Sequence, residues 1–197
     1  MLSERLRTLT AGLTNTIGTT LGQTGLSPNF FTVLGFIAVA FDAGLIALGY
    51  FQLAGALLIL SLLLDALDGA VARATNQTSA FGAFLDSTLD RWAEVAIFFG
   101  MLIALSHTNS TLDMVFVYWA ICGSLLVSYT RARAEAMGIP CKEGWFTRFE
   151  RMVVVIAGLL TTWLTLANGI IAVLATLTAM QRLWHVWTVS QRIDSKS

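Results

Sequence analysis

The sequence contains little charge: Asp, Glu, Lys and Arg together make up 12% of its 197 residues, about half the share that is usual in soluble domains. It also holds only two cysteines, two prolines and two histidines. Cys122 and Cys141 have neither the spacing of a zinc site nor the number that a disulfide framework needs. Apolar residues, in contrast, account for 56% of the chain. This composition indicates a membrane protein.

Long apolar runs divide most of the chain into candidate membrane-spanning helices, each of which needs about 20 apolar residues. The sequence predicts six spans, at roughly 31–51, 52–73, 81–106, 112–137, 148–167 and 168–189. Their short connections predict that neighbouring helices are antiparallel. We therefore expect an all-α, polytopic membrane domain of six transmembrane helices over residues 25–197.

The segment 1–24 has a different pattern. Apolar residues recur there at steps of three and four, at Leu2, Leu6, Leu9, Leu13 and Ile17. This period predicts an amphipathic helix that lies in the membrane interface, and a partly ordered tail is the alternative. The segment lacks the long apolar core and the cleavage pattern of a signal peptide.

The basic residues predict how the spans are oriented. Six spans place all twelve Lys and Arg residues on the side of the two termini, and none in the loops near 51, 107–112 and 167–169. Loops rich in Lys and Arg remain in the cytoplasm. We therefore expect a protein of the cell membrane with both termini and the acidic residues described next on the cytoplasmic side.

Two pairs of acids interrupt the apolar pattern. Asp65 and Asp68 are three residues apart, and Asp86 and Asp90 are four apart, so the members of each pair share one face of a helix. Carboxylates in an apolar segment are costly unless they pair with cations or bind metal. Four of them on two adjacent helices can enclose two Mg²⁺-like ions, which prefer oxygen and phosphate ligands. A buried ion-pair network with nearby arginines is the alternative.

The stretch that contains these acids resembles a known family signature. It reads D-A-L-D-G-A-V-A-R from Asp65 to Arg73, then eight residues, then G-A-F-L-D-S-T-L-D from Gly82 to Asp90. Every fixed position of the CDP-alcohol phosphatidyltransferase pattern, D-x2-D-G-x2-A-R-x8-G-x3-D-x3-D, is present. The resemblance implies transfer of a phosphatidyl group from CDP-diacylglycerol to an alcohol, with release of CMP, in phospholipid biosynthesis. Such relatives are homodimers in the membrane, and no nucleic-acid polymer is expected as a partner.

The same resemblance implies roles for individual residues. Asp65, Asp68, Asp86 and Asp90 would bind two metal ions, Mg²⁺ or Mn²⁺, and Asp90 would also accept the proton of the attacking hydroxyl. Five residues match positions that contact the CDP moiety: Asn29, Thr32, Gly69, Arg73 and Ser79. The alternative for Asn29 is an ordinary N-cap of the first span.

Arginines near the ends of the last three spans bear on the acceptor. Clustered arginines favour an anionic acceptor such as a phosphomonoester, whereas anchoring to lipid headgroups is the other interpretation. The segments S-Y-T-R-A-R-A-E at 128–135, R-F-E-R at 148–151 and Q-R at 181–182 look like elements of phosphatidylinositol-phosphate synthases. By this resemblance the phosphate of inositol phosphate would be bound by Arg131, Arg148, Arg151 and Arg182.

Some departures leave the acceptor open. Arg131 stands where lysine is common, and Thr147 and Phe149 replace the Glu and Pro of an E-R-P-E-R element. Synthases that use glycerol 3-phosphate carry similar R-A-R elements, so phosphatidylglycerol phosphate is the alternative product. A cation transporter would need acids distributed across the membrane, and a purely structural lipid-anchor subunit would not need the aspartate set. We therefore expect a phosphatidyltransferase, with inositol phosphate as its acceptor.

Overall fold

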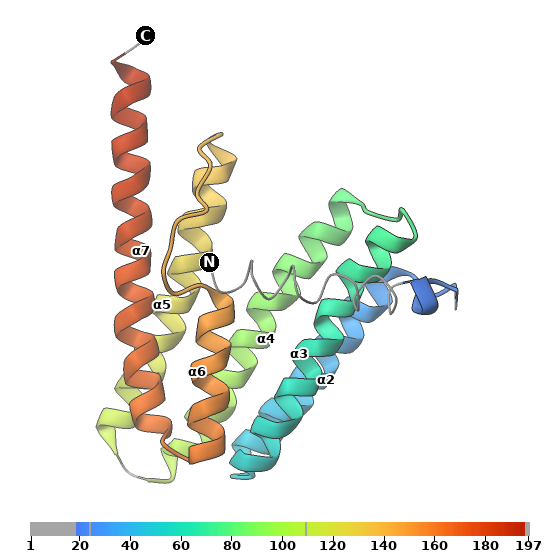
Figure 1. Ribbon diagram of the computed structural model, residues 1–197. Helices are drawn as coiled ribbons and strands as arrows, with labels where there is room; N and C mark the ends of the chain where they lie inside the picture. Colours follow the sequence, from blue (N-terminus) through green and yellow to red (C-terminus); the bar gives the residue numbers. More distant parts are fainter. Residues whose placement is uncertain (1–18, 24, 109, 196–197) are drawn as a thin grey trace. The chain divides into compact units, whose positions relative to one another are not determined.

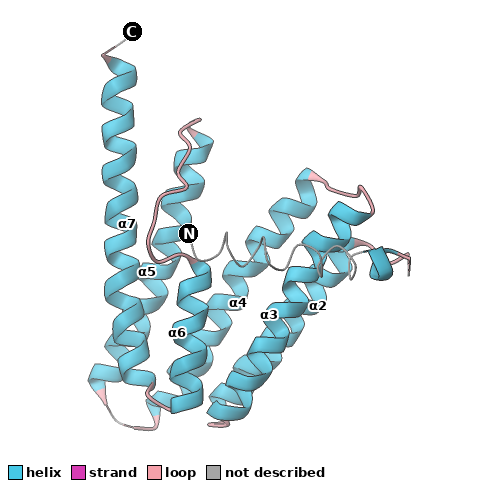
Figure 2. Cartoon of the chain, in the orientation of Figure 1, coloured by secondary structure: helices cyan, strands magenta, loops and turns pink. Residues whose placement is uncertain are grey.

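A computed structural model describes residues 19–23, 25–108 and 110–195 of the chain. Each described residue lies in a helix, a turn or a loop, and Figure 2 shows no strand among them. The predicted all-α class is confirmed. The amphipathic helix predicted over residues 1–24 lies largely outside the described residues, of which 19–22 are helical.

The labelled helices follow the order of the predicted spans (Figure 1). They are α2 (Pro28–Ala47), α3 (Phe51–Ala74), α4 (Ala80–Ser106), α5 (Thr111–Ala136), α6 (Arg148–Thr161) and α7 (Leu164–Asp194). The predicted boundary between the last two spans, near residue 167, was wrong. Thr162 adopts a left-handed conformation with φ of 62° and its N–H bonds to the Leu159 carbonyl, which ends α6. No glycine or proline marks this stop in the sequence.

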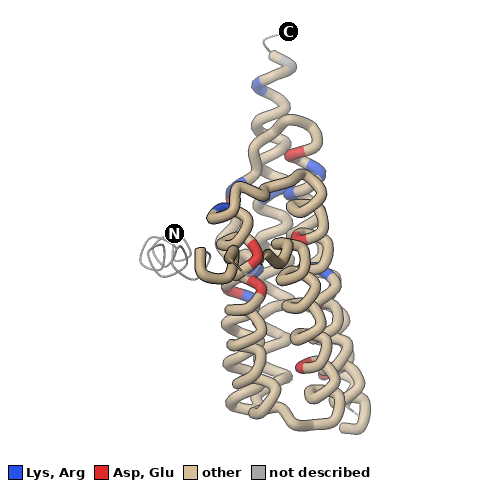
Figure 3. Tube along the Cα trace, turned by 90° about the vertical axis from the view of Figure 1, so that its right-hand side faces the viewer, with Lys and Arg blue, Asp and Glu red and all other residues tan. Residues whose placement is uncertain are grey.

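Within the described residues, four helices are long and apolar enough to cross a membrane: α2, α3, α5 and α7. Figure 3 shows long stretches of the Cα trace without charged residues. Helix α4 has sufficient length but contains several charged residues, and α6 has 14 residues, about 21 Å at 1.5 Å per residue. The four apolar helices indicate a membrane protein. The two further spans predicted at α4 and α6 do not meet the same criteria of length and apolar composition.

The chain divides into two compact units, residues 1–100 and 101–197. In the first unit, α2 and α3 pack along each other (Figure 1), with Ile46 and Leu58 fully buried in their core. Helix α4 approaches α2 so closely that a Cβ added at Gly100 would lie 2.4 Å from the Ala43 carbonyl oxygen. Glycine is therefore required at this crossing.

A buried polar pair lies within the apolar contact of α2 and α3. The Asp42 side chain is 1% exposed, and the Ser61 hydroxyl donates a hydrogen bond to it at 2.6 Å. A buried carboxyl group is stable in such surroundings only when it is hydrogen-bonded. The pair therefore links α2 to α3 inside their apolar contact.

In the second unit, α5 and α6 both pack against α7. Asp113 near the start of α5 accepts a hydrogen bond from the Thr165 hydroxyl of α7. Asp113 also donates its backbone N–H to Ser110, the N-cap of α5, at 3.3 Å. This carboxylate joins the ends of two helices, which explains an acid that is 8% exposed in an apolar unit.

Candidate active site

Three carboxylates of the predicted metal site converge in the first unit. Asp65 and Asp68 stand on α3 and Asp86 stands on α4, and one oxygen of each lies within 4.8 Å of the others. Asp68 is buried, whereas the other two are half-buried. Three carboxylates at this separation repel one another unless a cation lies between them. An all-oxygen donor set of this kind fits a hard divalent cation such as Mg²⁺ or Mn²⁺.

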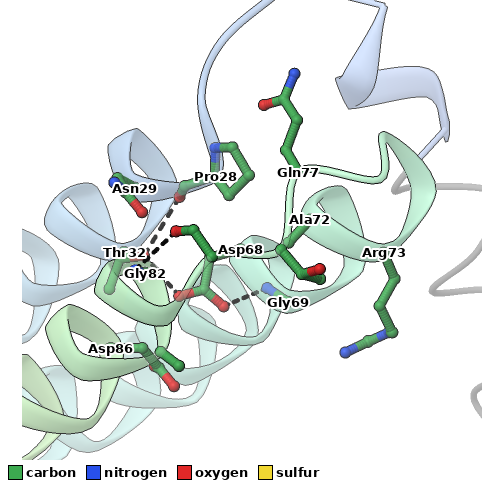
Figure 4. A pocket seen from close by; sticks show the side chains of 13 residues that line it. Pro28, Asn29, Thr32, Asp68, Gly69, Ala72, Arg73, Gln77, Gly82 and Asp86 are labelled. Carbon is green, nitrogen blue, oxygen red and sulfur yellow. Dashed lines mark hydrogen bonds between the residues drawn. The ribbon is translucent and has the colours of Figure 1, made fainter.

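Two donors fix the orientation of Asp68 (Figure 4). The Thr32 hydroxyl of α2 donates to its Oδ2 at 2.7 Å, and the backbone N–H of Gly69 donates to its Oδ1. Carboxylates that bind metal are usually held by such additional hydrogen bonds. The contact with Thr32 therefore supports the assignment of Asp68 as a ligand.

Asp90 follows Asp86 by one turn of α4. It is not one of the three acids whose oxygens lie within 4.8 Å of one another in the described part of the chain. Its side chain is 13% exposed, and Oδ2 lies 3.5 Å from Nη1 of Arg91. Its predicted roles as fourth ligand and as base stay predictions.

A pocket opens beside the acid cluster (Figure 4). It is lined by Pro28, Asn29, Thr32, Asp68, Gly69, Ala72, Arg73, Gln77, Thr78, Ser79, Gly82, Ala83 and Asp86. These residues come from α2, α3, the connection 75–79 and α4. All five residues predicted to contact the CDP moiety line the pocket, together with two of the predicted metal ligands. Residues far apart in the sequence thus form one site.

Glycines give this pocket its shape. The N–H of Gly82 donates to Oγ of Ser79 at 2.9 Å, the bond by which an N-cap starts a helix. A Cβ added at Gly82 would lie 3.0 Å from that Oγ and 3.1 Å from Oδ1 of Asn29. At Gly69 an added Cβ would lie 3.1 Å from Nη1 of Arg73. The absence of a side chain at Gly82 therefore leaves room for Ser79 and Asn29, and its absence at Gly69 leaves room for Arg73.

Several pocket residues belong to no motif that the sequence shows. Gln77 and Thr78 belong to the connection between the two halves of the aspartate signature, and Pro28 begins α2. Their only sequence signal is position: they fall between or beside residues that carry the chemistry. The side chains of Gln77 and Thr78 add hydrogen-bonding groups to the pocket.

The arginines predicted to bind the acceptor phosphate all lie in the second unit and differ in exposure. Arg131 is exposed, and its Nε pairs with Glu135 at 2.8 Å. Arg151 and Arg182 are buried, at 1% and 3% exposure. Arg148, at the start of α6, is half-buried. The four residues therefore do not form one uniform exposed surface.

The buried arginines support the connection 137–147 between α5 and α6. Arg182 donates from Nε to the Glu143 carbonyl at 2.8 Å and from Nη1 to the Val127 carbonyl. Nη1 of Arg151 donates to the Phe146 carbonyl at 3.4 Å. Cys141 of the same connection is fully buried, and this burial raises the pKa of its thiol. The connection is thus held in one conformation from α6 and α7.

We expect Arg182→Ala to destabilise the protein. The substitution removes a charged donor from two carbonyl groups, and hydrogen bonds to charged groups contribute about 1.5–3 kcal/mol each. Thermal unfolding in detergent should show a lower midpoint for this variant, whereas Arg192→Ala, at an exposed position of the same helix, should unfold like the wild type. Equal midpoints for all three proteins would contradict a supporting role for Arg182.

Comparison with known proteins identifies the family of the chain. The family model described as CDP-alcohol phosphatidyltransferase matches residues 25–187. A protein of Pyrococcus horikoshii named archaetidylinositol phosphate synthase is 38% identical over 170 residues, which cover 86% of this chain and 88% of that protein.

Solved structures agree with this match. A crystal structure of Mycobacterium tuberculosis phosphatidylinositol phosphate synthase with CDP-DAG bound has a TM-score of 0.84 and 32% identity, covering 89% of this chain and 94% of that one. The same synthase in complex with manganese and citrate has a TM-score of 0.84 and 32% identity, and covers 89% of both chains. The present chain belongs to the CDP-alcohol phosphatidyltransferase family.

Proposed function

We propose that this enzyme transfers a phosphatidyl group from CDP-diacylglycerol to a hydroxyl group of inositol phosphate. The acceptor oxygen forms a bond to the phosphorus that carries the diacylglycerol, the bond from that phosphorus to the CMP oxygen breaks, and CMP leaves. The observation that carries the proposal is the convergence of Asp65, Asp68 and Asp86 beside a pocket that contains the five predicted CDP-contacting residues.

The acids are the proposed ligands of two Mg²⁺ ions, with Mn²⁺ as a possible substitute. Asp65, Asp68 and Asp86 supply the converging oxygens, and Asp90 completes the set from the next turn of α4. When bound, divalent ions neutralise charge on the diphosphate and on the leaving CMP. The acids themselves provide a rigid, negatively charged end to the pocket.

Side chains of the pocket are the proposed contacts of the donor. Arg73 is exposed at the end of α3 and can donate two parallel hydrogen bonds to the diphosphate. Asn29, Gly69 and Ser79 line the same space. Thr32 is also there, but its hydroxyl is engaged with Asp68.

Asp90 is the proposed base. A base must lie within hydrogen-bond reach of the proton that it removes. Asp90 lies one turn from the ligand Asp86 on the same helix face, so it can approach a hydroxyl that attacks at the metal-bound end of the pocket. The proton of the acceptor hydroxyl passes to this carboxylate as the new bond to phosphorus forms.

The acceptor assignment depends on the arginines and on the named relatives. Arg131, Arg148, Arg151 and Arg182 are the proposed ligands of the acceptor phosphate, because an anionic acceptor requires positive charge at its site. The support is the resemblance of the segments 128–135 and 148–151 to inositol-phosphate-using synthases, and the names of the Pyrococcus and Mycobacterium proteins.

The proposed setting is a cell membrane crossed by six helices, α2 to α7, in a homodimer. Both termini and the acids are proposed to face the cytoplasm. The support is that six spans would place all twelve Lys and Arg residues on one side of the membrane, and loops rich in these residues remain in the cytoplasm.

An acceptor assay tests the proposal. Purified enzyme in detergent, supplied with CDP-diacylglycerol and Mg²⁺, should release CMP with inositol phosphate but not with glycerol 3-phosphate or free inositol. Free inositol is the matched control, because it lacks only the phosphate group. Activity with glycerol 3-phosphate alone would show that the proposed acceptor is wrong and that the proposed reaction class is right. Equal activity with inositol phosphate and free inositol would contradict a binding site for the acceptor phosphate.

A further inference from the structure

Helix α2 contacts both aspartates of α3 that belong to the metal cluster. Thr32 and Gly35 are three residues apart on α2, so they share one face. Both are buried. Thr32 meets Asp68, and Gly35 meets Asp65. Helix α2 supplies none of the three converging carboxylates, yet its buried face adjoins the Asp68 carboxylate and the backbone of Asp65.

The Thr32 hydroxyl is committed to Asp68. A hydroxyl group has one hydrogen to donate. Two acceptors lie near it, the Asp68 carboxylate at 2.7 Å and the Pro28 carbonyl at 3.3 Å (Figure 4). The shorter contact is to the charged acceptor, and such charge-assisted hydrogen bonds are the stronger ones. The hydrogen therefore goes to Asp68 and is not available to a nucleotide phosphate.

Gly35 controls how closely α2 approaches the backbone of Asp65. A Cβ added at Gly35 would lie 3.1 Å from Cα, 3.3 Å from N and 3.4 Å from Cβ of Asp65. Cα and N belong to the main chain, and Cβ is fixed to it. None of these atoms can move by a change of side-chain rotamer. Any larger residue at this position must displace Asp65 itself. Gly44, on the same helix, has no neighbouring atom within 4 Å of an added Cβ.

We propose that Thr32 and Gly35 are positioning residues of the metal site, which set the locations of the Asp68 and Asp65 carboxylates and thereby the affinity for divalent cations. The inference rests on the proposed function in one respect, that these acids bind metal. It assigns Thr32 a role different from the nucleotide contact that its place in the pocket indicates.

Thr32→Val and Thr32→Ser test the hydroxyl. Valine keeps the shape and removes the donor, whereas serine keeps the donor. Mn²⁺ binding to the purified protein without nucleotide is measured by the electron paramagnetic resonance signal of free Mn²⁺. We expect the valine variant to bind about 10- to 100-fold more weakly, the usual effect of losing a group that orients a ligand, and the serine variant to bind like the wild type. Unchanged Mn²⁺ affinity in Thr32→Val, with a raised KM for CDP-diacylglycerol, would overturn the inference.

Gly35→Ala and Gly44→Ala test the close approach. Both add one methyl group to α2, but only the first meets Asp65. We expect Gly35→Ala to weaken Mn²⁺ binding about tenfold, the lower end of the loss seen when a residue that orients a metal ligand is changed, and Gly44→Ala to leave it unchanged. Equal affinities in the two variants would overturn the role of Gly35. If Gly35→Ala does not fold, the Thr32 pair still decides the proposal.

Asp68→Asn separates this inference from the metal site on which it rests. If Asp68→Asn loses Mn²⁺ binding while Thr32→Val and Gly35→Ala retain it, the metal site stands and the positioning role fails. If the wild type and Asp68→Asn bind Mn²⁺ equally, the metal assignment fails, and the positioning role fails with it.

Discussion

Asp86→Asn is expected to reduce CMP release by about a thousandfold or more. Asp86 is the one residue of the converging cluster that α4 provides. A neutral amide cannot replace its charge opposite Asp65 and Asp68. Metal ions contribute several kcal/mol to such reactions, and each 1.4 kcal/mol corresponds to a factor of about ten in rate. The measurement is CMP release at saturating CDP-diacylglycerol and inositol phosphate over a range of Mg²⁺ concentrations.

Ser87→Ala is the matched control for this substitution. Ser87 is exposed, adjoins Asp86 on α4, and donates its hydroxyl hydrogen to the Phe84 carbonyl of its own helix. Its loss should leave activity within about a factor of two, because surface substitutions have small effects. An Asp86→Asn enzyme with wild-type activity at the same Mg²⁺ concentration would show that α4 contributes no essential ligand.

Local sequence information was sufficient to predict the order of helices α2 to α7 and the pairing of Asp65 with Asp68 on one helix face. Apolar runs of spanning length follow from the composition of each segment, and the spacing of Asp65 and Asp68 puts both on one helix face without knowledge of any other helix. The convergence with Asp86 needed one further assumption, that consecutive helices are antiparallel neighbours. The pocket residues Asn29 and Arg73 came from the family resemblance.

Contacts between helices could not be predicted in this way. The partner of Thr32 is 36 residues away in the sequence, and nothing local to Gly35 shows that the backbone of Asp65 lies against it. The Asp42 carboxyl was overlooked for the same reason, since only the packed structure shows that Ser61 bonds to it. Polar residues in apolar helices are explained by their tertiary partners.

The buried arginines show that a charge pattern in the sequence does not predict which groups an arginine contacts. The sequence predicts that Arg151 and Arg182 are positive residues near the ends of their spans, which is compatible with phosphate binding or with lipid anchoring. It does not show that Arg182 donates to the carbonyl of Glu143. A guanidinium group has five N–H donors, so an arginine can hold the backbone and still present donors to an acceptor phosphate. The arginines that hold the connection 137–147 are therefore also the proposed ligands of the acceptor phosphate.

The second large effect is expected at Asp90. Asp90→Asn should lower kcat by about 10²- to 10⁴-fold, the usual contribution of a general base, because the amide cannot accept the proton of the acceptor hydroxyl. Asp90 lies outside the three acids that converge within 4.8 Å, so Mn²⁺ binding should weaken less than in Asp86→Asn. The two readouts are kcat from CMP release and Mn²⁺ affinity without substrates.

Asp90→Glu is the conservative control, since it keeps a carboxylate on the same turn of α4. Partial recovery of kcat in this variant, relative to Asp90→Asn, is the result expected of a base whose reach has changed by one methylene group. Wild-type kcat in Asp90→Asn would exclude the base role. A loss of Mn²⁺ affinity in Asp90→Asn as large as that in Asp86→Asn would instead identify Asp90 chiefly as a ligand. The ratio of the loss in kcat to the loss in Mn²⁺ affinity therefore distinguishes a base from a metal ligand at Asp90.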